Sequence, residues 1–129
     1  PFAEQRFRQA KENLLKLRPV FKNGDLSEFI KIVESEALSL HAMMMTSMPY
    51  FILMKPNTLE IINRIWKFRD ETGSNVCFTL DAGANVHVLY PKMEKENVLR
   101  FIKNVLSQYC KNGEFIEDEA GMGAERITN

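Results

Sequence analysis

Two short runs of β-branched and aromatic residues, at positions 76–80 and 86–90, lie in the middle of a chain whose apolar residues otherwise follow helical spacing. The segment that joins the runs contains Asp81, Gly83 and Asn85, residue types that tight turns favour. We therefore expect the two runs to pair as an antiparallel hairpin. This hairpin, set among helical segments, indicates a mixed α+β fold.

Two amphipathic helices are expected before the hairpin, because apolar residues recur every three or four positions there. The first should end near Arg18, since Pro19 limits the continuation of a helix. The second begins at the capping pair Asp25 and Glu28 and reaches roughly Met43. Their short connection predicts an antiparallel helical hairpin. The apolar stripe of the first helix comprises Phe7, Ala10, Leu14 and Leu17.

Two further helices flank the β-hairpin. One follows the capping pair Asn57 and Glu60 and stops at Gly73, and the other follows Pro91 and ends before Gly113. Short strands are expected at residues 48–54, 115–116 and 124–127. From residue 48 onward the order is strand, helix, strand, strand, helix, strand, which is the split βαβ or ferredoxin-like arrangement. We therefore predict an α+β domain spanning residues 1–129, with an antiparallel sheet, helices on one face and a preceding helical hairpin.

The composition excludes several classes of partner. The 129 residues include 17 Lys and Arg and 17 Asp and Glu, so the formal net charge is +0 and strong overall attraction to nucleic acid or an anionic membrane is excluded. Residues 42–54, the longest apolar stretch, are too few to cross a bilayer, and no secretory leader precedes Phe7. We expect a cytoplasmic protein. Because the chain starts at Pro1 within helical periodicity, we expect it to be a piece of a longer protein.

Most polar and sulfur-containing residues have a structural explanation. His41 and His87 have no His or Cys partner at ligand spacing, so no metal site is expected, and His41 is expected to be a helix-end or satisfied interior histidine. Cys77 and Cys110 are expected to be small buried side chains. The acidic run at residues 114–119 is expected to be a solvated loop. The methionine cluster is expected to fill a gap between helix and sheet, and it comprises Met43, Met44, Met45 and Met48.

Asp81 is the candidate for chemistry, because it ends an apolar strand and opens a loop of small residues that a substrate can approach closely. A carboxylate at such a strand end accepts a proton or positions a hydroxyl. The alternative is an aspartate that starts a turn through a side-chain-to-backbone hydrogen bond. In that case the side chain would be occupied by its own turn, whereas a functional Asp81 should point into an open groove with few internal partners.

Residues 40–44, 49–51 and 77–89 together resemble the C-terminal half of the diphosphomevalonate decarboxylases, a family of the GHMP kinase superfamily. The most specific part is the Phe-Thr-x-Asp-Ala-Gly-x-Asn pattern at residues 78–85. The resemblance implies that Asp81 is catalytic and lies against the 3-hydroxyl of mevalonate diphosphate, with Ala82 and Gly83 beside the substrate. Two positions depart from the family pattern, which usually has proline at Ala84 and often a second proline at Met48.

The implied reaction uses ATP to phosphorylate the tertiary hydroxyl, and then releases phosphate and carbon dioxide to yield isopentenyl diphosphate. ATP and Mg²⁺ would be bound mainly by an N-terminal domain that this chain lacks, so the chain alone should be inactive. The family commonly forms homodimers. Two alternatives stay open: another GHMP small-molecule kinase, for which residues 121–123 offer only a weak glycine loop, and a non-catalytic ferredoxin-like binding or dimerisation module.

Overall fold

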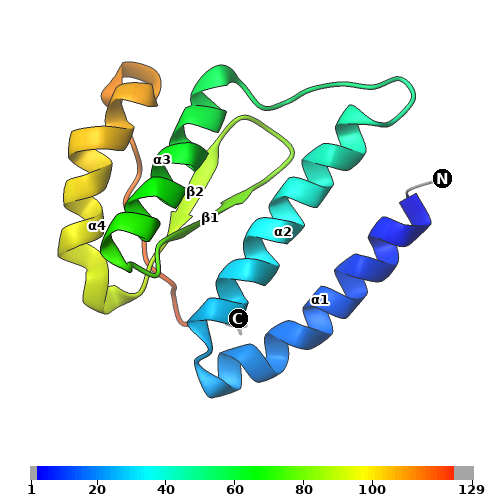
Figure 1. Ribbon diagram of the computed structural model, residues 1–129, viewed down its shortest axis with the longest axis horizontal. Coiled ribbons are helices and arrows are strands. Elements are labelled where there is room, and N and C mark those ends of the chain that lie inside the picture. Colours follow the sequence, from blue (N-terminus) through cyan, green and yellow to red (C-terminus); the bar gives the residue numbers. More distant parts are fainter. Residues whose placement is uncertain (1–2, 124–129) are drawn as a thin grey trace, which may run out of the picture.

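The computed structural model describes residues 3–123 and has four α-helices and one β-hairpin (Figure 1). The hairpin lies in the middle of the chain, with α2 and α3 on either side of it in this view. The helices are α1 (Ala3–Asn23), α2 (Leu26–Met45), α3 (Pro56–Thr72) and α4 (Lys95–Phe101). The strands are β1 (Cys77–Leu80) and β2 (Val86–Leu89). Shorter helical turns lie at Lys92–Glu94, Ile102–Leu106, Ser107–Tyr109 and Lys111–Gly113.

The predicted helical hairpin of α1 and α2 is confirmed, but the predicted end of α1 is wrong. The helix continues through Pro19 to Asn23 and stops at Gly24, whose φ of 66° is the left-handed conformation that favours glycine. A proline removes one backbone donor, and here the last turn is stabilised by tertiary contacts instead. Val20 is buried, and the ring of Phe21 lies 5.7 Å from that of Phe29 on α2.

Polar side chains join α1 to α2. Arg6 pairs with Glu36, and Asn13 Nδ2 donates to Glu36 Oε2 at 2.7 Å. Only part of the predicted apolar stripe faces α2, because Phe7 and Leu14 are each 62% exposed whereas Ala10 and Leu17 are half-buried. The inner face of α1 is therefore mixed, with polar and apolar side chains.

The antiparallel hairpin is confirmed, with Cys77 opposite Leu89 and Leu80 opposite Val86. The strands expected at residues 48–54 and 115–116 are wrong, because neither segment pairs with another strand. Their side chains do not cover a sheet either: Ile52 is 69% exposed and Ile116 is 95% exposed. The last expected strand, at residues 124–127, lies outside the described residues. The α+β class, the antiparallel pairing and the preceding helical hairpin are confirmed.

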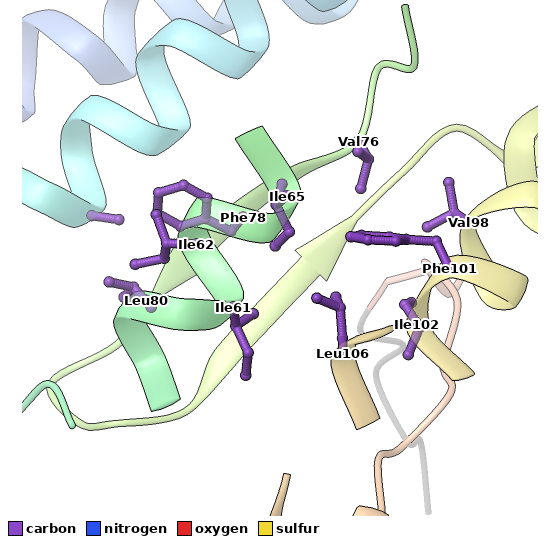
Figure 2. Close-up of a cluster of buried hydrophobic side chains, with 11 residues drawn as sticks. Ile61, Ile62, Ile65, Val76, Phe78, Leu80, Val98, Phe101, Ile102 and Leu106 are labelled. Carbon is purple, nitrogen blue, oxygen red and sulfur yellow. The ribbon is translucent and has the colours of Figure 1, made fainter. Parts of the chain in front are cut away.

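A cluster of buried apolar side chains joins α3 and the helical segment from α4 onward to β1 (Figure 2). Phe78 is completely buried, and its ring centroid lies 5.9 Å from that of Trp66. Since β1 contributes to this cluster along its whole length, it forms a rigid support for the residue that follows it. The cluster consists of Ala37, Ile61, Ile62, Ile65, Val76, Phe78, Leu80, Val98, Phe101, Ile102 and Leu106.

A buried ion pair connects α2, α3 and the start of β1. Arg69 Nη1 lies 2.7 Å from Glu34 Oε1 and also donates to the carbonyl of Val76 at 3.2 Å. Trp66 Nε1 donates to Glu34 Oε2 at 3.0 Å. The hydrogen bond that Arg69 donates to Glu34 is the main reason that the pKa of Arg69 is raised. Every charged oxygen of Glu34 therefore has a donor, as a buried carboxylate requires.

Replacing Glu34 with alanine should destabilise the protein by about 3 kcal/mol, because Arg69 and Trp66 are left without their acceptor in a largely buried place. Urea unfolding measures the loss. The matched control is Glu71→Ala, which breaks an exposed pair with Lys67 at 3.7 Å on α3 and should change stability by less than about 0.5 kcal/mol. Equal losses in the two variants would contradict this assignment.

Cys77 is buried on β1, as the sequence predicts. Burial, together with the nearby Glu34 carboxylate, raises the pKa of its thiol from 9.0 to about 12. The thiol therefore stays protonated near neutral pH, and since the thiolate is the nucleophile, Cys77 is unreactive there.

The raised pKa predicts a loss of stability in alkali. Above about pH 9 the unfolded thiol loses its proton while the folded one retains it, so the unfolding free energy falls by up to about 1.4 kcal/mol per pH unit. Cys77→Ala lacks this ionisation, and other groups titrate equally in both proteins. Urea unfolding at increasing pH should give a shallower decline for the variant, and identical declines would rule out the buried, protonated thiol.

Candidate functional site

Asp81 follows the last residue of β1 and presents its carboxylate outward. The side chain is 88% exposed, and Oδ2 lies 3.3 Å from Nε2 of His87 on β2. Among the described residues the carboxylate makes no hydrogen bond to its own turn. The turn is closed instead by the main chain, since the N–H of Gly83 donates to the carbonyl of Asp81 at 2.8 Å. Asp81 thus has few internal partners, as expected of a functional residue, and its side chain is not tied to its own turn.

His41, on α2, is an interior histidine with its hydrogen bond satisfied, as the sequence predicts. Its residue exposure is 1%, and Nε2 lies 2.9 Å from the carbonyl oxygen of Asp81. Since a carbonyl oxygen only accepts hydrogen bonds, Nε2 carries the proton and donates it. The side chain of a helix residue thus contacts the backbone of the candidate catalytic residue.

Thr58, near the start of α3, makes the corresponding contact at the other end of the loop. Its hydroxyl donates to the carbonyl of Ala84 at 2.7 Å and accepts from the N–H of Lys55 at 3.1 Å. Thr58 is 2% exposed. The sequence gives no signal for this contact, because a threonine in the first turn of a helix is also a common local cap and its spacing carries no sign of a partner 26 positions away.

Ala82 and Gly83 lie at the tip of the loop beside Asp81. Ala82 is exposed and Gly83 is half-buried. A side chain added at Gly83 would meet no atom within 4 Å, so the backbone there is open to an approaching molecule. A surface groove of about 700 Å³ between α1 and α2 is lined by Arg6, Arg8 and Thr46, and it does not include the loop. The loop therefore lies at the surface, outside this groove.

The loop and its neighbours supply acid–base and hydrogen-bonding chemistry. In residues 3–123, no three His, Cys, Asp or Glu side chains are arranged to hold a metal ion. An exposed carboxylate with an imidazole beside it can accept a hydrogen bond or a proton from a hydroxyl brought to it. Any phosphate-bearing substrate would need further groups to hold its phosphates.

Other sequence predictions have mixed outcomes. Met44 is buried and fills space, but Met48 is 87% exposed, so the prediction that the whole methionine cluster fills a gap is wrong. Met48 lies just after the end of α2, and its side chain is open to solvent. In the acidic run, Glu117 pairs with Lys95 at 2.7 Å and the segment is exposed, as expected for a solvated loop. None of the helices in the described part of the chain has the length and apolar character that a membrane span needs.

The model of the family described as the mevalonate 5-diphosphate decarboxylase C-terminal domain matches residues 1–128. The chain therefore belongs to this family, which confirms the resemblance read from residues 40–44, 49–51 and 77–89. A curated relative, the phosphomevalonate decarboxylase of Haloferax volcanii, is 31% identical over 72 residues, which make up 56% of this chain and 22% of that protein.

Solved structures agree with this membership. The mevalonate diphosphate decarboxylase of Legionella pneumophila is 35% identical with a TM-score of 0.76, over 82% of this chain and 34% of that chain. The mevalonate diphosphate decarboxylase of Enterococcus faecalis is 25% identical with a TM-score of 0.77, over 84% of this chain and 34% of that chain. A structure of MDDEF in complex with MVAPP, AMPPCP and magnesium has the same identity and TM-score. This chain spans about a third of the length of these structures.

Proposed function

We propose that this domain forms one wall of the active site of an ATP-dependent decarboxylase that converts mevalonate 5-diphosphate into isopentenyl diphosphate, phosphate, ADP and carbon dioxide. Asp81 is the catalytic residue, and Ala82 and Gly83 provide backbone beside the substrate. The observation that supports this proposal is the free, 88% exposed carboxylate of Asp81 on a loop whose backbone is hydrogen-bonded to two helices. Membership of the decarboxylase family supplies the substrate class.

In the proposed reaction, the 3-hydroxyl oxygen of the substrate forms a bond to the γ-phosphorus of ATP, and ADP leaves with the electron pair. The hydroxyl proton passes to the carboxylate of Asp81. The C–O bond then breaks and phosphate leaves. Finally the bond to the substrate carboxylate breaks, its electrons form the new double bond, and carbon dioxide is released.

Asp81 has a second role in this proposal. Positive charge develops on the tertiary carbon as phosphate departs. Once its proton has moved on to phosphate or solvent, the carboxylate is negative again and stabilises that charge. Because both roles depend on distance, placement of the carboxylate matters more than its basicity.

ATP and Mg²⁺ are proposed to be held mainly by the rest of a longer protein, consistent with the absence of a metal-ligating cluster in residues 3–123. On their own the 129 residues should therefore be inactive. From family membership we also propose that the complete protein acts in the cytoplasm as a homodimer.

A substrate with a single phosphate is the second candidate. The observation that favours it is the 31% identity to a phosphomevalonate decarboxylase. The chemistry at the tertiary carbon is the same for the monophosphate and the diphosphate substrate, because the two differ only in the phosphate group at the other end of the molecule. Comparing carbon dioxide release from the two substrates at equal concentration decides between them.

Asp81→Asn in the complete protein should lower kcat by about 10³-fold, because an amide cannot take up the hydroxyl proton. The assay is ATP-dependent release of carbon dioxide from mevalonate diphosphate, which also separates a decarboxylase from a kinase. The variant should fold normally, since the carboxylate is exposed.

The matched control is Asp118→Asn, which neutralises another exposed aspartate far along the chain and should leave kcat within about twofold, as for most surface changes. Near-normal turnover by Asp81→Asn would refute the catalytic assignment. A wild-type protein that binds but never turns over would favour the non-catalytic module.

A further inference from the structure

Two buried polar side chains hold the backbone of the Asp81 loop, one on each side of it. His41 reaches from α2 to the carbonyl of Asp81 at 2.9 Å, and Thr58 reaches from α3 to the carbonyl of Ala84 at 2.7 Å. The two contacts join residues 40 and 26 positions apart in the sequence. They connect the loop to both helices that pack on β1.

Burial makes these contacts important. His41 and Thr58 are 1% and 2% exposed, and a buried imidazole or hydroxyl destabilises a protein unless it is hydrogen-bonded. His41 meets that need at the carbonyl of Asp81, and Thr58 at the carbonyl of Ala84 and the N–H of Lys55. The loop carbonyls are therefore the required partners of both side chains.

Apart from these two contacts, the loop is held by the pairing of Leu80 with Val86 at its ends and by the contact of Asp81 Oδ2 with His87 at 3.3 Å. No residue from 81 to 85 is a proline, so the main-chain torsions are not restricted by a ring. The Asp81 carbonyl accepts from both His41 and the N–H of Gly83, which orients the peptide group that follows Asp81. Because β1 fixes the backbone before Asp81 and this peptide group fixes the backbone after it, the direction of the Cα–Cβ bond of Asp81 is also set.

We propose that His41 and Thr58 are positioning residues, which hold the 81–85 loop so that the carboxylate of Asp81 meets its substrate in a reactive orientation. This inference rests on the proposed function for its effect on turnover. Neither residue touches the substrate. They act through the main chain, and a displacement of about 1 Å at a reacting group can lower a rate by about 100-fold.

The test uses paired variants of the complete protein. His41→Leu removes the donor, whereas His41→Gln retains an N–H near the position of Nε2. Thr58→Val removes the hydroxyl at nearly equal size, whereas Thr58→Ser retains it. The measurements are kcat and KM for mevalonate diphosphate with saturating ATP, and the methyl order parameters of Ala82 and Ala84, which follow loop motion without any need for activity.

We expect His41→Leu and Thr58→Val to lower kcat by about tenfold to a hundredfold with KM changed less than about threefold. The alanine order parameters should fall from about 0.85 toward 0.6 or below. His41→Gln and Thr58→Ser should restore both quantities to near wild-type values. Since Thr58→Val is nearly isosteric, it tests the inference even where His41→Leu fails to fold.

Unchanged order parameters in the donor-free variants would overturn the inference, as would a uniform loss of activity that the conservative variants do not restore. Failure of the proposed function gives a different result. If Asp81→Asn retains turnover while the donor-free variants lower the order parameters of the loop, then His41 and Thr58 do hold the loop, but Asp81 is not the catalytic residue.

Discussion

The hydrogen-bonded ion pair between Glu34 and Arg69 sets how α2 lies against β1, and the geometry of the loop depends on that placement. Arg69 also contacts the carbonyl of Val76, at the start of the strand. His41 stands seven residues after Glu34, about 10 Å further along α2, and contacts Asp81 just past the end of the strand. Helix α2 is thus held at both ends of the strand, at its start through Arg69 of α3 and past its end through His41, and a shift along the helix axis would break both contacts.

Helix α3 also holds the hairpin through contacts near both of its ends. Thr58 in its first turn holds Ala84, and Arg69 in its last part holds Val76, with the isoleucines of the buried cluster between them (Figure 2). Burial of apolar side chains supplies most of the favourable free energy. Several placements of α3 along β1 would bury a similar apolar area, and the polar contacts at the ends of the helix select one of these placements.

The sequence predicts the helices and the β-hairpin well, because apolar spacing, capping pairs and turn residues are local signals. It fails where tertiary contacts decide. Pro19 does not end α1, since packing of Val20 maintains the last turn. Residues 48–54 have strand-like composition but find no strand to pair with, and the N–H of Phe51 instead donates to the carbonyl of Met44 at 3.2 Å. The sequence predicts the position of Asp81 at a strand end, whereas the contact of Thr58 with Ala84 is evident only in the folded structure.

Because His41, Thr58 and Gly83 all bond to loop main chain, the scaffold makes no demand on the side chain at position 81. The main-chain carbonyl of Asp81 takes part in holding the loop, and its side-chain carboxylate carries the proposed reactivity. The functional group at that position is consequently interchangeable: evolution or a protein engineer could install an amide, a hydroxyl or a longer acid there and obtain new reactivity from an unaltered framework.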